Sequence, residues 1–218
     1  LVPVDDGGTL KSATERATAL QQDGLVKVVV ALGKAATDEA VQRALGDLPM
    51  MVVGYWGNIA SGSHVVVLAN EQIPSQLGAS DNMEIVIAAE APAPLTGNDM
   101  LALAQLPLLR PDSSDVTVIS SGSLPDNTFR ERYVGSGQFV PEPGLLATLT
   151  YDAFGMVLEA IEAGNVAESL TQMTYEGLNG SIHFEHGYWV NAPMNRYCYE
   201  ANPTSDKAKQ NAILQLCN

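Results

Sequence analysis

The hydrophobic and polar positions of the first 60 residues follow two periods, which predict alternating helices and strands. A helical spacing of apolar residues, ended by Gly24, runs through Leu10, Ala13, Ala17 and Leu20. The continuous apolar run 26–32 predicts a strand buried on both faces, as in a parallel sheet. A second helix opened by Thr37 and a strand at Met50–Val53 follow. This order predicts an α/β fold with mostly parallel sheets flanked by helices.

The later pattern predicts a smaller sheet, a long helix and a terminal helix. Strands are expected at 64–69, 84–89 and 115–120, with one short helix over 98–106. Apolar residues recur at helical spacing from Leu145 to Ala163, and Gly164 ends that pattern. Residues 206–216, capped by Ser205, are predicted to form a helix that closes the chain.

Composition and charge exclude two classes of protein. The 218 residues are 46% hydrophobic and 17% charged, and they contain no apolar run of membrane-spanning length. The 25 acidic residues outnumber 11 basic ones and give a formal charge of −14. Because that charge repels phosphate backbones, nucleic-acid binding is not expected.

Candidate catalytic chemistry is sparse. His183 and His186 lie three positions apart, and residues at that spacing face opposite sides of a strand, so a zinc site completed by His64 is not favoured. The sequence contains neither a Gly-rich phosphate loop nor a Gly-x-Ser-x-Gly motif. We therefore expect no enzyme activity, no metal and no cofactor.

Two sets of motifs resemble the type I periplasmic binding proteins, the branched-chain amino-acid receptor family. The first set is Tyr151-Asp152-Ala153 followed by 175–184, which resembles the family's Tyr-Asp-Ala helix and Phe/Tyr-Glu-Gly-x-x-Gly-x-Ile-x-Phe hairpin. The segment 129–133 is similar to the Phe-x-x-x-Tyr stretch that precedes this helix. At the other end, 2–8 is similar to the family's strand that ends in Asp-Asp, and a Gly-initiated loop follows the next strand.

The resemblance implies a type I periplasmic-binding-protein-like fold with a shortened second lobe. Lobe one is expected from 1–60 plus 121–165, and the smaller lobe, with the C-terminal hairpin and helix, from 61–120 plus 166–218. Family members begin with one more strand and helix. The sequence leaves open whether this version is minimised, lacks that unit, or receives it from another chain.

The expected ligand site is formed by the loops that follow the first two parallel strands, where backbone N–H groups and helix N-termini converge. In the family these loops hold the ligand carboxylate with Ser and Thr, and only Thr37 retains a hydroxyl here. Lys34 adds a cation that suits an anionic group. Aromatic walls come from Tyr55 and Trp56, for which packing under the crossover between the lobes is the alternative, and Asn58 completes the predicted set.

The resemblance implies an extracytoplasmic protein that binds an amino acid or small organic anion for an ABC-type uptake system, with an ABC permease as partner. A lipid or signal-peptide anchor is expected ahead of Leu1. The alternative is a receptor fold repurposed as an interaction or assembly module in the cell envelope. In such an oxidising compartment Cys198 and Cys217 are predicted to form a disulfide, with two unconnected thiols as the alternative.

Overall fold

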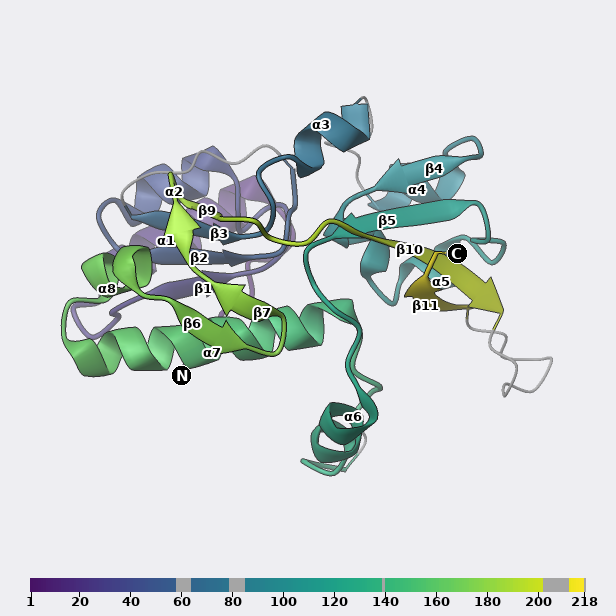
Figure 1. Ribbon diagram of the computed structural model, residues 1–218. Coiled ribbons are helices and arrows are strands. Elements are labelled where there is room, and N and C mark those ends of the chain that lie inside the picture. Colours follow the sequence, from purple (N-terminus) through teal and green to yellow (C-terminus); the bar gives the residue numbers. More distant parts are fainter. Residues whose placement is uncertain (58–63, 79–84, 139, 202–211, 218) are drawn as a thin grey trace.

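The structure is a computed structural model that describes residues 1–57, 64–78, 85–138, 140–201 and 212–217 (Figure 1). The elements of the first half are α1 (Leu10–Gln22), β1 (Val29–Ala31), α2 (Glu39–Leu45), β2 (Met50–Val53), β3 (Val65–Leu68), α3 (Ile73–Leu77), α4 (Ile85–Glu90), β4 (Leu95–Gly97) and the 3-10 helix η2 (Asp99–Ala102). Those of the second half are α5 (Leu106–Leu109), β5 (Val116–Ser120), α6 (Asn127–Val134), α7 (Leu145–Ala163), α8 (Val166–Gln172), β6 (Tyr175–Gly177), β7 (Gly180–Ile182), β8 (Phe184–Glu185), β9 (Tyr188–Trp189), β10 (Asn195–Ala201) and β11 (Ala212–Leu216).

The first sheet has the strand order β1-β2-β3-β9-β8, in which only β8 runs antiparallel to its neighbour. Its central strands β2 and β3 are buried on both faces. Met50 and Val52 point to the side covered by α1 and α2, whereas Met51 and Val53 point to the side covered by α7. The apolar runs of these strands are therefore explained by a sheet between two helical layers.

The second sheet has the order β11-β10-β5-β4 and lies beside the first (Figure 1). Strands β4 and β5 are parallel, and β10 runs antiparallel to both β5 and β11. One hydrophobic cluster includes residues of both sheets, among them Val67 and Val118. Apolar packing is therefore continuous from one sheet to the other.

The predicted long helix is confirmed with its bounds, since α7 spans Leu145–Ala163 and ends at Gly164 in the left-handed conformation. The strand Met50–Val53 is also confirmed. The predicted strand 26–32 is shorter in the structure, and the helix expected over 98–106 is divided into η2 and α5.

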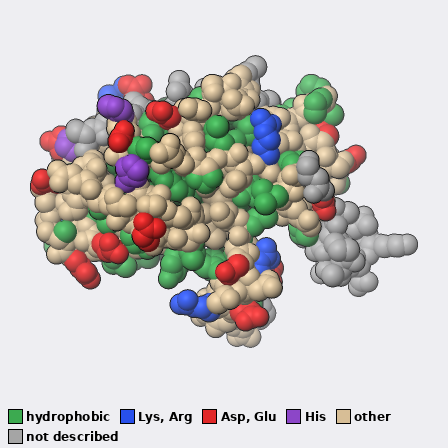
Figure 2. Space-filling view, viewed as in Figure 1, with side chains coloured by type: hydrophobic (Ala, Val, Ile, Leu, Met, Phe, Trp, Pro, Cys, Tyr) green, Lys and Arg blue, Asp and Glu red, His purple; other side chains and the backbone are tan. Residues whose placement is uncertain are grey.

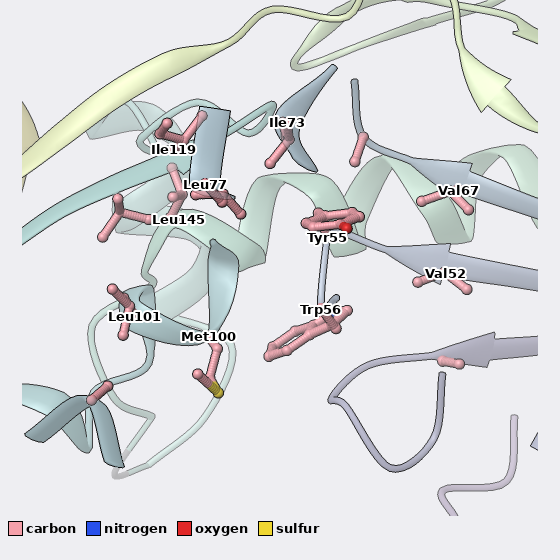
Figure 3. Close-up of a cluster of buried hydrophobic side chains, with 14 of the residues drawn as sticks. Val52, Tyr55, Trp56, Val67, Ile73, Leu77, Met100, Leu101, Ile119 and Leu145 are labelled. Atoms are coloured by element: carbon pink, nitrogen blue, oxygen red, sulfur yellow. The ribbon is translucent and has the colours of Figure 1, made fainter. Parts of the chain in front are cut away.

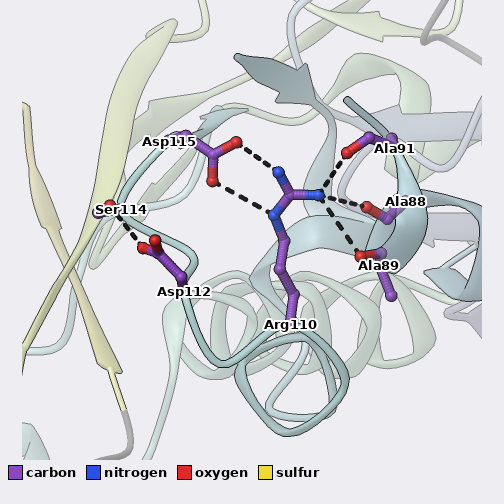
Figure 4. A network of polar contacts seen from close by, with 7 residues as sticks. All are labelled: Ala88, Ala89, Ala91, Arg110, Asp112, Ser114 and Asp115. Carbon is purple, nitrogen blue, oxygen red and sulfur yellow. Dashed lines mark hydrogen bonds and ion pairs between the residues drawn. The ribbon is translucent and has the colours of Figure 1, made fainter. Parts of the chain in front are cut away.

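The strand predicted at 84–89 is wrong, because Ile85–Glu90 forms α4. A short apolar run cannot be assigned from periodicity alone. Tertiary contacts favour the helix here: the Arg110 guanidinium donates to the carbonyl oxygens of Ala88, at 3.2 Å, and Ala91, at 2.7 Å (Figure 4). The same guanidinium pairs with Asp115, so its charge is satisfied while it stabilises the end of the helix.

The predicted terminal helix 206–216 is also wrong where the structure describes it. Residues 212–216 form β11, while Ser205 and 206–211 lie outside the described residues. The predicted disulfide between Cys198 and Cys217 is present and joins β10 to the end of β11. Because β11 pairs with β10, Cys217 lies beside Cys198. The Cys217 N–H donates to the Arg196 carbonyl oxygen at 2.9 Å.

Two N-terminal expectations also differ from the structure. Residues 2–6 form no strand, and no described strand pairs with them. The second helix is capped by the Asp38 carboxylate, which accepts the Ala40 N–H at 2.8 Å, and not by Thr37. Asp38 is in the N-cap position because its backbone is extended and α2 begins one residue later.

The expected division into two lobes stays a prediction, although the strand pairing bears on its boundaries. Strands β3, β8 and β9 come from ranges assigned to the smaller lobe, yet they pair in the first sheet. The β6–β7 hairpin packs on α7, which covers the same sheet. We therefore propose boundaries drawn around the two sheets.

Candidate functional site

The predicted ligand residues lie in two loops that we call the strand-end loops, 32–38 after β1 and 54–57 after β2. Thr37 is buried, and its hydroxyl donates to the carbonyl oxygens of Gly33, at 3.0 Å, and Lys34, at 3.3 Å. The hydroxyl therefore stabilises its own loop in this conformation. Lys34 is partly buried, and Asn58 lies outside the described residues.

Tyr55 and Trp56 lie inside the hydrophobic core, with exposed fractions of 0% and 5%. Figure 3 shows both rings in the buried cluster between the sheets, with Trp56 extending toward Met100. The Trp56 indole N–H donates to the Val53 carbonyl oxygen at 2.7 Å. A ligand could therefore contact these rings only after the surrounding residues move, and the predicted ligand set stays a prediction.

A buried carboxylate that the sequence pattern did not single out lies next to these rings. Asp99 begins η2 and has an exposed fraction of 0%. Its Oδ2 accepts the Tyr55 N–H at 2.7 Å, and its Oδ1 accepts the Ser120 hydroxyl. Burial raises the pKa of Asp99 to about 6, and both hydrogen bonds oppose that rise. Asp99 therefore links a loop of the first sheet to a strand of the second.

Three chain segments cross between the sheets, and hydrogen bonds join them side by side. They are 69–72 after β3, 121–124 after β5 and 190–194 before β10. The Asn70 N–H donates to Ser121 Oγ at 2.8 Å, and the Asn70 amide donates to the Ala192 carbonyl oxygen. The Tyr197 hydroxyl donates to the Gly122 carbonyl oxygen at 2.7 Å. Three connections between the two sheets therefore run side by side and are held together by hydrogen bonds.

The motif Tyr151-Asp152-Ala153 has a structural role. Asp152 is fully buried in α7, and its carboxylate accepts the N–H groups of Leu178, at 2.8 Å, and Asn179, at 2.9 Å. A Cβ on Gly177 would lie 2.5 Å from the Asp152 carboxyl carbon, so glycine is required for this approach. The Tyr-Asp-Ala motif of α7 and the Glu-Gly-x-x-Gly motif of the β6–β7 hairpin therefore contain the residues that attach the hairpin to the helix.

The same hairpin is fastened to one of the crossing segments. The Asn179 side-chain oxygen accepts the Ser123 N–H at 2.7 Å, and the Thr148 hydroxyl donates to the Ser123 carbonyl oxygen at 2.7 Å. The sequence motif alone does not predict these two hydrogen bonds, because their partners are 56 and 25 residues apart in the chain.

A groove with a volume of 1440 Å³ lies away from the strand-end loops. It lies among α6, the first half of α7 and β10–β11, and Lys34, Thr37, Tyr55 and Trp56 do not line it. Phe129 stacks on Tyr133, with ring centroids 5.9 Å apart, and meets the edge of Tyr151 at 5.7 Å. Helix α6 contributes no buried residue, so one wall of the groove is an exposed helix (Figure 1).

The surface and the polar clusters add little further chemistry. Acidic side chains are scattered over the face in Figure 2 and do not gather in one patch. Within the described ranges, no three His, Cys, Asp or Glu side chains are grouped closely enough to hold a metal ion. None of the helices in that part of the chain combines the length and apolarity needed to cross a membrane.

Sequence comparison finds neither a matching protein-family model nor a matching curated protein. Solved structures do match. A leucine-binding protein from Thermotoga maritima is similar with a TM-score of 0.67 and 13% identity, over 100% of this chain and 86% of its own. An ABC transporter substrate-binding protein from Desulfitobacterium hafniense, in complex with Leu, has a TM-score of 0.64 and 15% identity, over 98% and 88%.

A third structure is a solute-binding protein of an ABC transporter from R. palustris in complex with benzoate. Its TM-score is 0.60 at 12% identity, over 99% of this chain and 84% of its own. At such identities the likeness concerns the fold and not the ligand. These structural neighbours are type I periplasmic solute-binding proteins, and the chain has their type I periplasmic-binding-protein-like α/β fold, as its motifs predicted.

Proposed function

We propose that the chain is a non-catalytic, extracytoplasmic solute-binding protein that delivers an amino acid or small organic anion to an ABC permease. The observation that carries this proposal is the structural correspondence with solute-binding proteins over at least 98% of the chain in three cases. The Cys198–Cys217 disulfide supports a periplasmic or extracellular location, because such bonds persist in oxidising compartments. A lipid anchor preceding Leu1 belongs to the same proposal.

We place the solute at the strand-end loops, against Lys34, Thr37, Tyr55, Trp56 and Asn58. The carboxyl ends of parallel strands are the favoured ligand position in open α/β sheets. The two aromatic rings are buried in this conformation. Binding therefore requires the sheets to separate about the three crossing segments, so that a solute can enter before they close again.

A thermal-shift screen with amino acids, small carboxylates and aromatic acids tests the proposal. A compound at ten times its dissociation constant stabilises the folded protein by about 1.4 kcal/mol, which gives a measurable rise in melting temperature. The rise should be lost in Lys34→Ala and retained in Lys11→Ala, which removes an exposed lysine of α1.

A rise that survives Lys34→Ala but is lost in Tyr151→Ala would place the solute in the groove instead. Tyr151 lines that groove and is half exposed, so its replacement should leave the core intact.

The second candidate is an interaction or assembly module of the cell envelope, without a small ligand. Three observations favour it. The Tyr55 and Trp56 side chains are buried in the core, and the Asp99 carboxylate already accepts the Tyr55 N–H. The aromatic groove also exceeds the usual small-molecule pocket of roughly 300–1,000 Å³. A folded protein whose melting temperature no compound raises would favour this candidate over solute binding.

A further inference from the structure

The two oxygens of the Asp99 carboxylate have separate hydrogen-bond partners on separate sheets. Oδ2 accepts the backbone N–H of Tyr55, which follows β2, and Oδ1 accepts the hydroxyl of Ser120 at the end of β5. Both partners are buried with Asp99. A single carboxylate thus spans the junction of two sheets whose described strands do not pair with one another.

The surroundings are shaped for a carboxylate. Gly54 has a φ of +80°, and a Cβ there would lie 2.9 Å from Asp99 Oδ2, so only glycine leaves room for the oxygen. Ser120 Oγ accepts the Gly122 N–H at 3.0 Å, which leaves its proton free to point at Asp99. Both donors are therefore fixed in place by their own chain segments.

Among the described residues, the groups that act on the Asp99 carboxyl supply hydrogen bonds and no opposite charge. The groups that favour its ionised form are the Ser120 hydroxyl and the Tyr55 N–H, which are neutral. Tyr197 lies close enough for the charge of Asp99 to help raise the pKa of its phenol. Hydrogen bonds from such donors to a carboxylate are shorter and stronger than those between two neutral groups.

We infer that the Tyr55 N–H and the Ser120 hydroxyl form a carboxylate-binding site that the chain fills with its own Asp99, fastening the two sheets together. A solute carboxylate that enters between the sheets must use other donors or displace this side chain. The inference goes beyond the proposed function and holds whether or not the chain carries a solute.

The test replaces the tethered carboxylate by a free one. Asp99→Gly removes the side chain and leaves space for acetate, and Asp99→Ala leaves space for formate. Sodium acetate or formate should raise the melting temperature of the matching variant in a saturable manner, whereas sodium chloride at equal ionic strength should not. Wild type and Asp99→Asn, in which the site stays filled, should show no specific response.

A second substitution locates the bound carboxylate. In the Asp99→Gly background, Ser120→Ala should weaken acetate binding by roughly tenfold or more, since hydrogen bonds to charged groups contribute about 1.5–3 kcal/mol. Ser114→Ala, which removes an exposed hydroxyl that donates to Asp112, is the matched control and should leave acetate binding unchanged.

If Asp99→Gly does not fold alone, acetate should restore a cooperative melting transition. The inference is overturned if acetate and formate act no differently from chloride on folded variants. It is equally overturned if an unfolded variant stays unfolded in acetate, or if binding is insensitive to Ser120→Ala.

Discussion

Replacing Asp99 by Asn should remove a specific part of the pH dependence of stability. Burial raises the pKa of Asp99 from 3.8 to about 6 in the folded protein, and the unfolded chain restores the ordinary value. At pH values between these two pKa values, the Asp99 carboxyl is protonated in the folded state and ionised in the unfolded state. The stabilisation is therefore fully present below pH 3.8 and is lost as the pH rises through about 6.

The magnitude follows from the difference between the two pKa values. At about 1.4 kcal/mol for each pH unit, the rise corresponds to about 3 kcal/mol of unfolding free energy. The unfolding free energy of wild type minus the unfolding free energy of Asp99→Asn should therefore fall by about 3 kcal/mol from pH 3.5 to pH 7.5. The asparagine can keep both contacts, because its oxygen can accept the Tyr55 N–H while its amide donates to Ser120 Oγ.

The assay is urea unfolding of both proteins at several pH values, followed by the fluorescence of Trp56 and Trp189, which are buried. Carboxylates common to the two proteins cancel in the difference, and the Tyr197 phenol beside Asp99 stays neutral because its pKa is raised. Parallel pH profiles of the two proteins would show that burial does not raise the pKa of Asp99. So would a difference that grows as the pH rises, which would mean that the folded protein lowers the pKa of Asp99.

Two further substitutions, each with a matched control, and one reduction test the packing and the cross-links. Gly177→Ala should lower the unfolding free energy by about 3 kcal/mol because its Cβ would overlap Asp152, whereas Gly24→Ala, with open space around it, should change it by less than about 0.5 kcal/mol in urea unfolding. Arg110→Met leaves Asp115 and the end of α4 without their partner and should lower the unfolding free energy by about 3 kcal/mol. Arg43→Met breaks an exposed ion pair and should lower it by less than about 1 kcal/mol in the same assay. Reduction of Cys198–Cys217, which are 19 residues apart, should cost about 3 kcal/mol, and thiol titration without reductant should find no free thiol; two thiols per chain would contradict the structure.

The elements that could be predicted from sequence are those whose pattern is long or unbroken. Helix α7 shows its period over several turns, and β2 is an apolar run followed by glycine, so both were placed with their bounds. In contrast, α4 and β11 are short, and contacts distant in sequence determine them. Arg110 stabilises α4 from 19 to 22 residues away, and β11 pairs with β10 across the segment closed by the disulfide.

The candidate site shows the same limit. The sequence placed Lys34, Thr37, Tyr55 and Trp56 in loops after parallel strands, and the structure has them there. It could not show that the rings are buried or that Asp99 reaches Tyr55, because that contact joins residues 44 positions apart. The sequence shows only that Asp99 follows Asn98, a residue that caps the next helical turn. Local capping is enough to explain that pair, so it does not point to a long-range contact.

Isothermal titration calorimetry decides whether this fold binds a small molecule at the strand-end loops. The compound with the largest thermal shift is titrated into wild type, Lys34→Ala and Lys11→Ala. Solute binding at these loops predicts saturable binding of one molecule per chain, weakened about tenfold or more by Lys34→Ala, the loss of roughly 1.4 kcal/mol, and unchanged by Lys11→Ala. A folded protein that gives no binding heat with any compound of the set, or binding that both variants leave unchanged, would contradict it.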